Sequence, residues 1–230
     1  MPTIVFASPK GGVGKSTSAV VLASELARTG ADVVVIDADP NRPVSKWGKL
    51  DGKPANLAVV SDVTEGTIID EIEACSTKVP FVVVDLEGTA SMTVAYAISR
   101  ADLVIIPVQG SQLDAAEAAK AIKLIRQQER AFARRIPYAV LFTRTSAVIR
   151  PRLLGHIRHE LRAADVPIFA VQMHEREAFR AIFSFGGTIQ TLQPSQVSNL
   201  TAAASNARAF AAEVVAILRE TAPAKNGRAA

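Results

Sequence analysis

The stretch SPKGGVGKST occupies residues 8–17 and comes directly after a short apolar run, Thr3 to Ala7. A helical pattern opens at the end of this stretch and runs from Ser16 to Arg28. A strand, a glycine-rich turn and a helix start, in this order, are the context in which phosphate-binding loops occur. The stretch therefore predicts a phosphate-binding loop at the carboxyl end of the first strand of an α/β fold.

Each residue type in the loop has a chemical reason to be there. Glycines at positions 11, 12 and 14 have no Cβ, so the backbone can curl and turn its N–H groups toward a phosphate. The helix that starts here directs the positive end of its dipole at the same anion. Lys15 is expected to reach the β- and γ-phosphates, and the Ser16 hydroxyl is expected to ligate Mg²⁺. The alternative, a chance glycine turn with solvated lysines, does not explain why motif and context agree.

The loop departs from the common pattern G-x-x-x-x-G-K-[ST], because Pro9 stands at the first glycine position and a second lysine, Lys10, precedes Lys15. In this form, KGGxGK[ST], it resembles the deviant Walker A motif of the ParA/MinD family of ATPases. The resemblance implies ATP and Mg²⁺ as cofactors, and it implies that Lys10 reaches across a dimer interface to the nucleotide of the other subunit. The loop residues expected to bind the nucleotide are Lys10, Gly11, Gly12, Val13, Gly14, Lys15, Ser16 and Thr17.

Two further apolar runs end in aspartates, at the place where open α/β sheets bind ligands. Asp32 to Ile36 is followed by Asp37 and Asp39, and Phe81 to Val84 is followed by Asp85. The resemblance implies that Asp39 positions the attacking water, that Asp37 supports the Mg²⁺ and loop network, and that Asp85 holds Mg²⁺. Turn residues and helix N-caps are the alternative interpretation of these aspartates.

These assignments define the expected chemistry of the site. The catalytic set is Lys10, Lys15 and Asp39, and the metal set is Ser16, Asp39 and Asp85. Family members commonly continue D-[TC]-P-[PA]-G after the Walker B aspartate, whereas this chain continues Leu86-Glu87-Gly88-Thr89. The proline is absent, so the loop that senses the γ-phosphate is expected to differ. By resemblance, Thr143 and Arg144 lie near the adenine and join Asp37 among the nucleotide-binding residues.

The composition indicates one domain. The chain has 230 residues, of which 49% are hydrophobic, and this suits a single α/β domain over residues 1–221 with a flexible tail over 222–230. No run of about 18 apolar residues occurs, and the first residues enter a strand without a basic-then-apolar signal segment. Cys75 is the only cysteine, which excludes a disulfide framework and a cysteine-based metal site. These features point to the cytoplasm.

The remaining patterns predict a doubly wound α/β fold. Its sheet is expected to be mostly parallel, with seven or eight strands flanked by helices. The other expected strands are 57–60, 103–107, 138–142 and 166–171, and the other expected helices are 45–50, 67–75, 113–135, 151–163 and 199–218. Pro167 suits an edge strand. The buried side of the long helix 113–135 is expected to include Phe132.

Positive charge is concentrated in one part of the chain. The net charge is +4, but Lys120 to Arg180 holds 13 Lys and Arg against 5 Asp and Glu, while the rest holds 13 against 17. Such asymmetry favours a face that binds a polyanion. In the ParA family the ATP-bound dimer binds DNA non-specifically through basic residues in this part. The residues expected to contact DNA are Arg150, Arg152, Arg176 and Arg180.

Three functions remain open at this point. The resemblance favours a nucleoid-associated partition ATPase with a ParB-like partner, which moves a plasmid or other cargo. The stretch MHEREAF, residues 173–179, resembles the VirC-type branch and favours a DNA-transfer accessory that recruits a relaxase complex. A MinD-like membrane regulator is the third possibility, but the helix 199–218 is alanine-rich with few basic residues, so no stable membrane anchor is expected. Electron transfer like that of nitrogenase iron protein is excluded, because one cysteine cannot hold a cluster.

Overall fold

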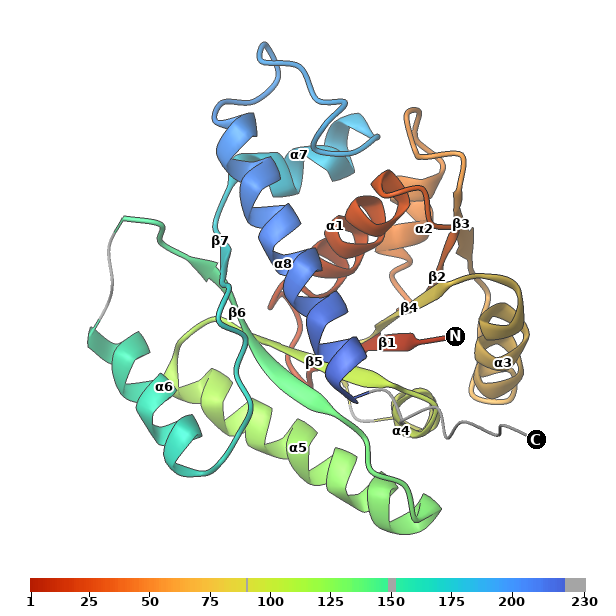
Figure 1. Cartoon of the computed structure of the whole chain (residues 1–230), viewed down its shortest axis with the longest axis vertical. Coiled ribbons are helices and arrows are strands. Elements are labelled where there is room, and N and C mark those ends of the chain that lie inside the picture. Colours follow the sequence, from red (N-terminus) through yellow and green to blue (C-terminus); the bar gives the residue numbers. More distant parts are fainter. Residues whose placement is uncertain (90, 149–151, 222–230) are drawn as a thin grey trace, which may run out of the picture.

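The computed structural model describes residues 1–89, 91–148 and 152–221, and within them one sheet of seven strands runs through the molecule (Figure 1). The strands lie in the order β3-β2-β4-β1-β5-β6-β7, and every neighbouring pair is parallel. Their bounds are β1 (Thr3–Phe6), β2 (Val33–Ala38), β3 (Leu57–Val60), β4 (Phe81–Leu86), β5 (Leu103–Val108), β6 (Tyr138–Thr145) and β7 (Met173–His174). The expected doubly wound parallel sheet is confirmed.

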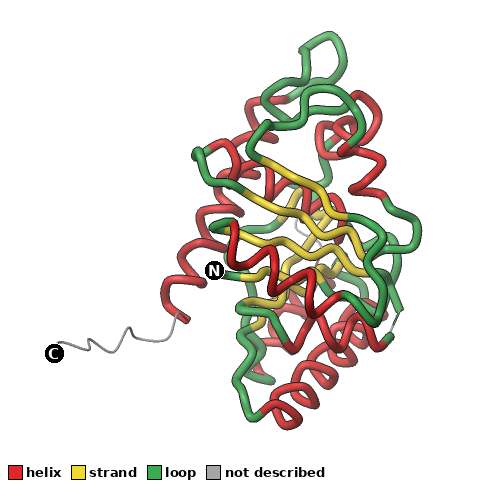
Figure 2. Tube along the Cα trace, turned by 90° about the vertical axis from the view of Figure 1, so that its right-hand side faces the viewer, coloured by secondary structure: helices red, strands yellow, loops and turns green. Residues whose placement is uncertain are grey.

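Helices cover both faces of this sheet, as the edge-on view shows (Figure 2). Their bounds are α1 (Lys15–Arg28), α2 (Pro43–Gly48), α3 (Ile68–Lys78), α4 (Met92–Ser99), α5 (Gln112–Phe132), α6 (Arg152–Ala163), α7 (Glu177–Phe185) and α8 (Leu200–Thr221). One core lies between the sheet and α1, α2, α7 and α8, and the other lies between the sheet and α3 to α6. Because both faces are buried, strands such as VVVI and LVII are continuous apolar runs rather than alternating ones.

The strand order puts the phosphate-binding loop at the point where the winding reverses. From β1 the chain passes to β2 on one side of the sheet, whereas β4 leads across β1 to β5 on the other side. Ligands of doubly wound sheets bind outside the carboxyl ends of the strands at this point. The register also sets Asp85 beside Phe6 of β1 and beside Asp37 of β2, so the two aspartates end adjacent strands.

The strand expected over residues 166–171 is wrong. Only Ile168 forms a bridge, to Val140 of β6, and β7 comprises the two residues Met173–His174. The physical reason is competition from α8, whose Glu213 carboxylate accepts the N–H groups of Ala170 and Val171 at 2.6 and 2.8 Å. Asn206 of α8 binds the next backbone groups, accepting from His174 N and donating to the carbonyl of Gln172.

Two smaller differences concern helices. The pattern did not predict α4, although Ser91 caps its start by accepting the N–H of Val94. The expectation that Phe132 is buried is wrong, because it is the last residue of α5 and 45% of it is exposed. The apolar side of α8 does pack on the sheet through Ala203, Ala207, Phe210 and Val214. Within the described residues, no helix is long and apolar enough to span a membrane. The expected tail 222–230 lies outside the described residues.

Candidate functional site

The loop of residues 8–17 has the backbone that its glycines suggest. Gly12 and Gly14 have φ of 75° and 91°, in the left-handed region that side chains with a Cβ rarely adopt. Gly14 is the N-cap of α1, which begins at Lys15. The loop therefore curls tightly between β1 and the start of a 14-residue helix, and the helix dipole points into the curl.

Two carbonyl groups of the loop accept hydrogen bonds from side chains outside it, one directly after β5 and one in β6. Gln109 Nε2 donates to the carbonyl of Gly12 at 2.8 Å, and Thr143 Oγ1 donates to that of Val13 at 2.7 Å. The buried Thr143 hydroxyl also lies 3.1 Å from the carbonyl of Val108, so it ties the loop to the end of β5. Sequence reasoning missed Gln109, although its place directly after a buried strand put it at the same edge of the sheet.

Lys15 lies folded over this loop. Its Nζ donates to the carbonyl of Lys10 at 3.1 Å, and only 5% of the residue is exposed. Burial lowers the pKa of Lys15, and the carboxylates of Asp85, Asp39 and Glu87 oppose that shift in decreasing order. The backbone of Lys10 therefore helps to position Lys15 within its own subunit.

Two buried carboxylates near the ends of β2 and β4 have oxygens without a regular hydrogen-bond partner among the described residues. Asp85 is fully buried, and neither of its oxygens accepts a hydrogen bond of regular geometry from the described residues. Burial raises the pKa of Asp85 to about 7, whereas the nearby Ser16 hydroxyl and then the Lys15 ammonium favour its ionised form. In Asp37 one oxygen accepts from the N–H and hydroxyl of Ser45 at 2.6 and 2.7 Å, and the other has no partner in the part of the chain that the structure describes.

This donor set fits Mg²⁺. Unpartnered carboxylate oxygens beside the Ser16 hydroxyl are hard oxygen ligands of the kind that Mg²⁺ prefers, directly or through water. The described residues contain no group of three His, Cys, Asp or Glu side chains that could hold a metal by themselves. A Mg²⁺ ion here would therefore need phosphate oxygens or water to complete its shell.

A cavity of about 490 Å³ opens over the loop at the carboxyl edge of the sheet. Its lining residues are Gly11, Gly12, Gly14, Lys15, Ser16, Thr17, Asp39, Pro40, Asn41, Glu87, Gly88, Thr89 and Arg144. Asp39 accepts the N–H and side-chain amide of Asn41 through one oxygen, at 2.8 and 3.0 Å. The structure thus brings the expected residues Ser16, Thr17, Asp39 and Arg144 to one cavity, and it adds Asn41 and the 87–89 loop.

Arg144 reaches this cavity from an irregular strand. It lies between Thr143 and Thr145, where the pairing of β6 with β7 shifts register, and its φ is 50°. A bulge re-aims a side chain, and a non-glycine residue in this conformation is strained. The exposed Arg144 also lines a smaller hollow of about 40 Å³ beside Thr17.

The arginines expected to bind DNA do not share one location. Arg176 and Arg180 line the smaller hollow next to the loop, and Arg180 pairs with Glu175 at 2.8 Å. Arg152 is exposed at the start of α6, and Arg150 lies outside the described residues. Their role in DNA binding stays a prediction.

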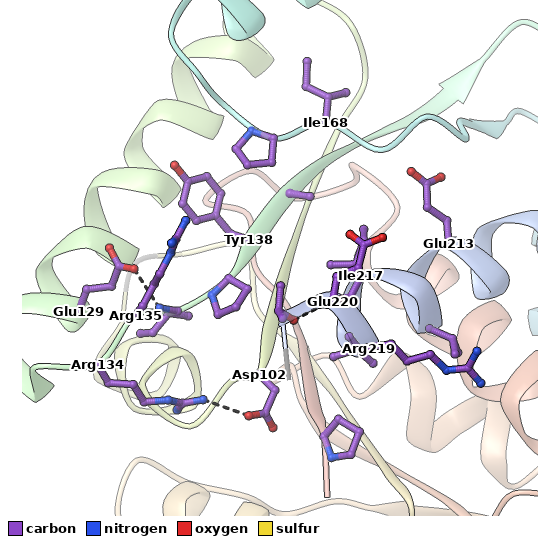
Figure 3. Close-up of a pocket in the computed structure, with 18 of the residues that line it drawn as sticks. Asp102, Glu129, Arg134, Arg135, Tyr138, Ile168, Glu213, Ile217, Arg219 and Glu220 are labelled. Carbon is purple, nitrogen blue, oxygen red and sulfur yellow. Dashed lines mark hydrogen bonds and ion pairs between the residues drawn. The ribbon is translucent and has the colours of Figure 1, made fainter. Parts of the chain in front are cut away.

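A larger hollow, of about 1340 Å³, opens at the opposite edge of the sheet, between the end of α8 and the start of β6 (Figure 3). Three of its charged groups serve the fold: Arg134 pairs with Asp102 at 3.1 Å, and Glu129 accepts the N–H of Ile136 at 2.9 Å. None of the loop residues lines it. The chemistry of the loop therefore belongs to the smaller cavity at the carboxyl edge.

Comparisons with known proteins agree with this assignment. The family model described as VirC1 protein matches residues 1–222. The chain is 43% identical to Protein ParA of Rhizobium radiobacter over 220 residues, which cover 96% of this chain and 99% of that protein. Solved structures with the same fold include the McdA(D38A)–ATP complex of Cyanothece, with a TM-score of 0.75, 17% identity and coverage of 94% and 96% of the two chains.

A further structural neighbour is MinD of Pyrococcus horikoshii with Mg-ADP, with a TM-score of 0.71, 16% identity and coverage of 96% and 98%. Identities this low show the fold alone, whereas the family model and the ParA relative span nearly the whole chain. With the phosphate-binding loop and the paired aspartates, they assign the protein to the VirC1 family, within the ParA/MinD group of P-loop ATPases.

Proposed function

We propose that this ParA-like partition ATPase binds Mg-ATP at the carboxyl edge of its sheet, forms an ATP-dependent sandwich dimer and, in that state, binds DNA non-specifically. A ParB-like partner then stimulates slow hydrolysis and releases the dimer, so that repeated cycles move a plasmid or other cargo. The observation that carries the proposal is the buried Asp85 carboxylate, which has no regular hydrogen-bond partner among the described residues and lies near the Ser16 hydroxyl and the Lys15 ammonium.

Each site residue has a separate role in the proposed hydrolysis of ATP. Lys15 supplies the positive charge for the transferring phosphate, and the P-loop backbone orients it. Bound Mg²⁺ supplies neutralisation of phosphate charge when present. Asp39, whose second oxygen is not used by Asn41, orients the attacking water. Lys10 adds a cation from the partner subunit.

Exposed apolar side chains around the cavity support the sandwich dimer. Leu113 and Val148 are 74% and 90% exposed, and Met92 and Leu153 are 49% exposed. Leu113, Met92 and Leu153 lie at the starts of α5, α4 and α6, and Val148 follows β6, so all four lie at the carboxyl edge. Large apolar side chains left in water around one edge indicate a surface that associates.

The experiment compares subunit association with ADP and with ATP, by light scattering after gel filtration. ATP should give a dimer, and Lys10→Ala should still bind nucleotide but lose dimer-dependent hydrolysis. Leu113→Ser should weaken the dimer, whereas Phe132→Ser, a matched change at an exposed apolar residue of the same helix away from this edge, should not. Normal hydrolysis by Lys10→Ala, or equal DNA affinity with ADP and ATP, would refute the proposal.

The match to the VirC1 family favours a second candidate, a DNA-transfer accessory that recruits a relaxase complex. The stretch 173–179 that resembles this branch lies beside the loop, since Met173, His174 and Phe179 line the small hollow with Thr17. Footprinting on a transfer-origin fragment against random duplex distinguishes the two candidates. Protection confined to the origin fragment would support the accessory function, and uniform coating would support partition.

A further inference from the structure

The outward side of α5 carries a line of cations that the nucleotide site does not use. Lys120, Lys123, Arg126 and Arg130 are exposed and follow one another at spacings of three or four residues. Residues at these spacings lie on the same side of a helix, so the four form one continuous surface, called here the α5 basic face. The helical rise spaces its charges about 4.5 to 6 Å apart along the axis.

Pairing within the protein neutralises little of this charge. Lys120 contacts Glu117 at 2.7 Å, in an exposed pair three residues apart. Glu129 is turned to the backbone, where it accepts the N–H of Ile136. Among the residues that the structure describes, Lys123, Arg126 and Arg130 have no carboxylate within ion-pair distance. Arg130 Nε donates to the carbonyl of Arg126, which leaves both charges on the surface.

At the end of α5 the basic face meets a shallow hollow of about 520 Å³ that is lined mostly by arginines. The lining residues are Arg126, Glu129, Arg130, Ala133, Arg134 and Arg135. Arg134 serves the fold, since it pairs with Asp102 (Figure 3) and also donates to two backbone carbonyls, at 3.0 and 2.6 Å. The exposed Arg135 turns away from that pair in the same view and extends the positive surface.

The residues between the cations indicate what this surface binds. Between Lys120 and Arg130 the other exposed position is Gln127, and the exposed Ala116, Ala119 and Ala131 flank the line, whereas the exposed Leu113 and Phe132 lie at the two ends of α5. Protein partners are held mainly by aromatic and large apolar anchors, and the face offers none between its charges. Duplex DNA carries one charge per about 3.4 Å along each strand, so a line of flexible cations can follow a strand without reading bases.

We propose that the α5 basic face binds the phosphate backbone of duplex DNA. The inference rests on the proposed function, which supplies DNA as the partner. It places the main contact on the side of the sheet covered by α3 to α6, away from Arg176 and Arg180 beside the nucleotide loop. The contact is electrostatic, independent of base sequence and steeply dependent on salt.

The test measures binding of a labelled random-sequence duplex by fluorescence anisotropy, with ATP and Mg²⁺, between 50 and 200 mM salt. The variant is Lys123→Gln/Arg126→Gln/Arg130→Gln, and the matched control is Lys46→Gln/Lys49→Gln, which removes exposed charges from α2 and the residue after it, on the other side of the sheet. The control should bind as the wild type does. The triple variant should bind at least about tenfold more weakly. The slope of the logarithm of its binding constant against the logarithm of the salt concentration should be smaller in magnitude by about 2.7, or about 0.9 for each contact removed.

The outcomes separate the two claims. A wild-type protein that binds no duplex with ATP refutes the proposed function, whereas wild-type binding that the triple variant retains in affinity and slope refutes this inference alone. Poly-L-glutamate tests the other class of polyanion: if the triple variant loses the polymer but keeps the duplex, the inference is overturned. Should the triple variant fail to fold, Arg126→Gln alone must lower the slope by about 0.9.

Discussion

Gly88 allows a direct test of how closely the loop after β4 packs against the phosphate-binding loop. A Cβ at position 88 would lie 2.7 Å from the nitrogen of Gly11, and 3.0 Å from the Cα of Gly11 and the carbonyl carbon of Lys10. All three are backbone atoms, so no side-chain rotation can relieve the contact. In Gly88→Ala one of the two loops must therefore move.

The size of the effect follows from the contact. Forcing an extra methyl group into a packed site costs about 1–3 kcal/mol. Both loops line the nucleotide cavity, so the strain reduces nucleotide binding whichever loop yields. Since about 1.4 kcal/mol corresponds to tenfold in affinity, Gly88→Ala should bind nucleotide about 5- to 150-fold more weakly.

The assay is titration with a fluorescent ATP analogue and Mg²⁺, with thermal melting recorded on the same samples. Gly155→Ala is the matched control, because an added Cβ at this α6 position has nothing within 4 Å. The control should bind as the wild type does and gain up to about 1 kcal/mol of helix stability. Equal nucleotide affinity for Gly88→Ala and the wild type would refute the packing of the two loops described here.

Three further predictions concern polar side chains of the site and the fold. The pKa of Asp85 is about 7 in the folded chain, against an ordinary 3.8, so the folded state holds the Asp85 proton at pH values where the unfolded state has lost it. Without nucleotide and Mg²⁺, the free energy of unfolding should therefore fall as pH rises from about 4 to 7 and then level off. Asp85→Asn should remove this pH dependence and raise the free energy of unfolding at pH 8 by a few kcal/mol, on the order of the pKa shift itself. Urea titrations at several pH values measure this, and an unchanged pH dependence would contradict the raised pKa of Asp85. Thr143→Val leaves the Val13 carbonyl without its donor and should cost about 1–3 kcal/mol and weaken nucleotide binding, as checked by denaturation and titration. In Glu213→Ala, the amides of Ala170 and Val171 should exchange hydrogen faster, while the amides of β1 stay protected. Unchanged exchange at Ala170 and Val171 would show that contacts other than Glu213 hold this part of the chain.

Much of the fold was predictable because its signals are local. Continuous β-branched runs identify buried parallel strands, and Leu57–Val60 was placed with the bounds that the structure has. The loop could be identified because its glycines, lysines and helix start are contiguous in the sequence. The aspartates could be expected at the same edge because each directly follows a strand.

The parts that could not be predicted depend on contacts between distant residues. Nothing near Val171 in the sequence indicates that Glu213, on a helix far along the chain, accepts its N–H. Likewise, the role of Gln109 follows from the adjacency of β5 and β1, which the sequence pattern alone does not specify. The positive φ of Arg144 arises from pairing with β7, and a single arginine carries no signal for it.

The Glu213 carboxylate has a consequence for how copies of this protein can assemble. An edge strand with unpaired backbone groups can pair with a strand of another molecule, and repeated pairing of this kind leads to aggregation. Here the N–H groups of Ala170 and Val171 are already occupied by a helix of the same chain, and the border strand β7 is only two residues long. Growth by strand addition is therefore blocked at this edge of the sheet, so any contact between copies here must be made by side chains.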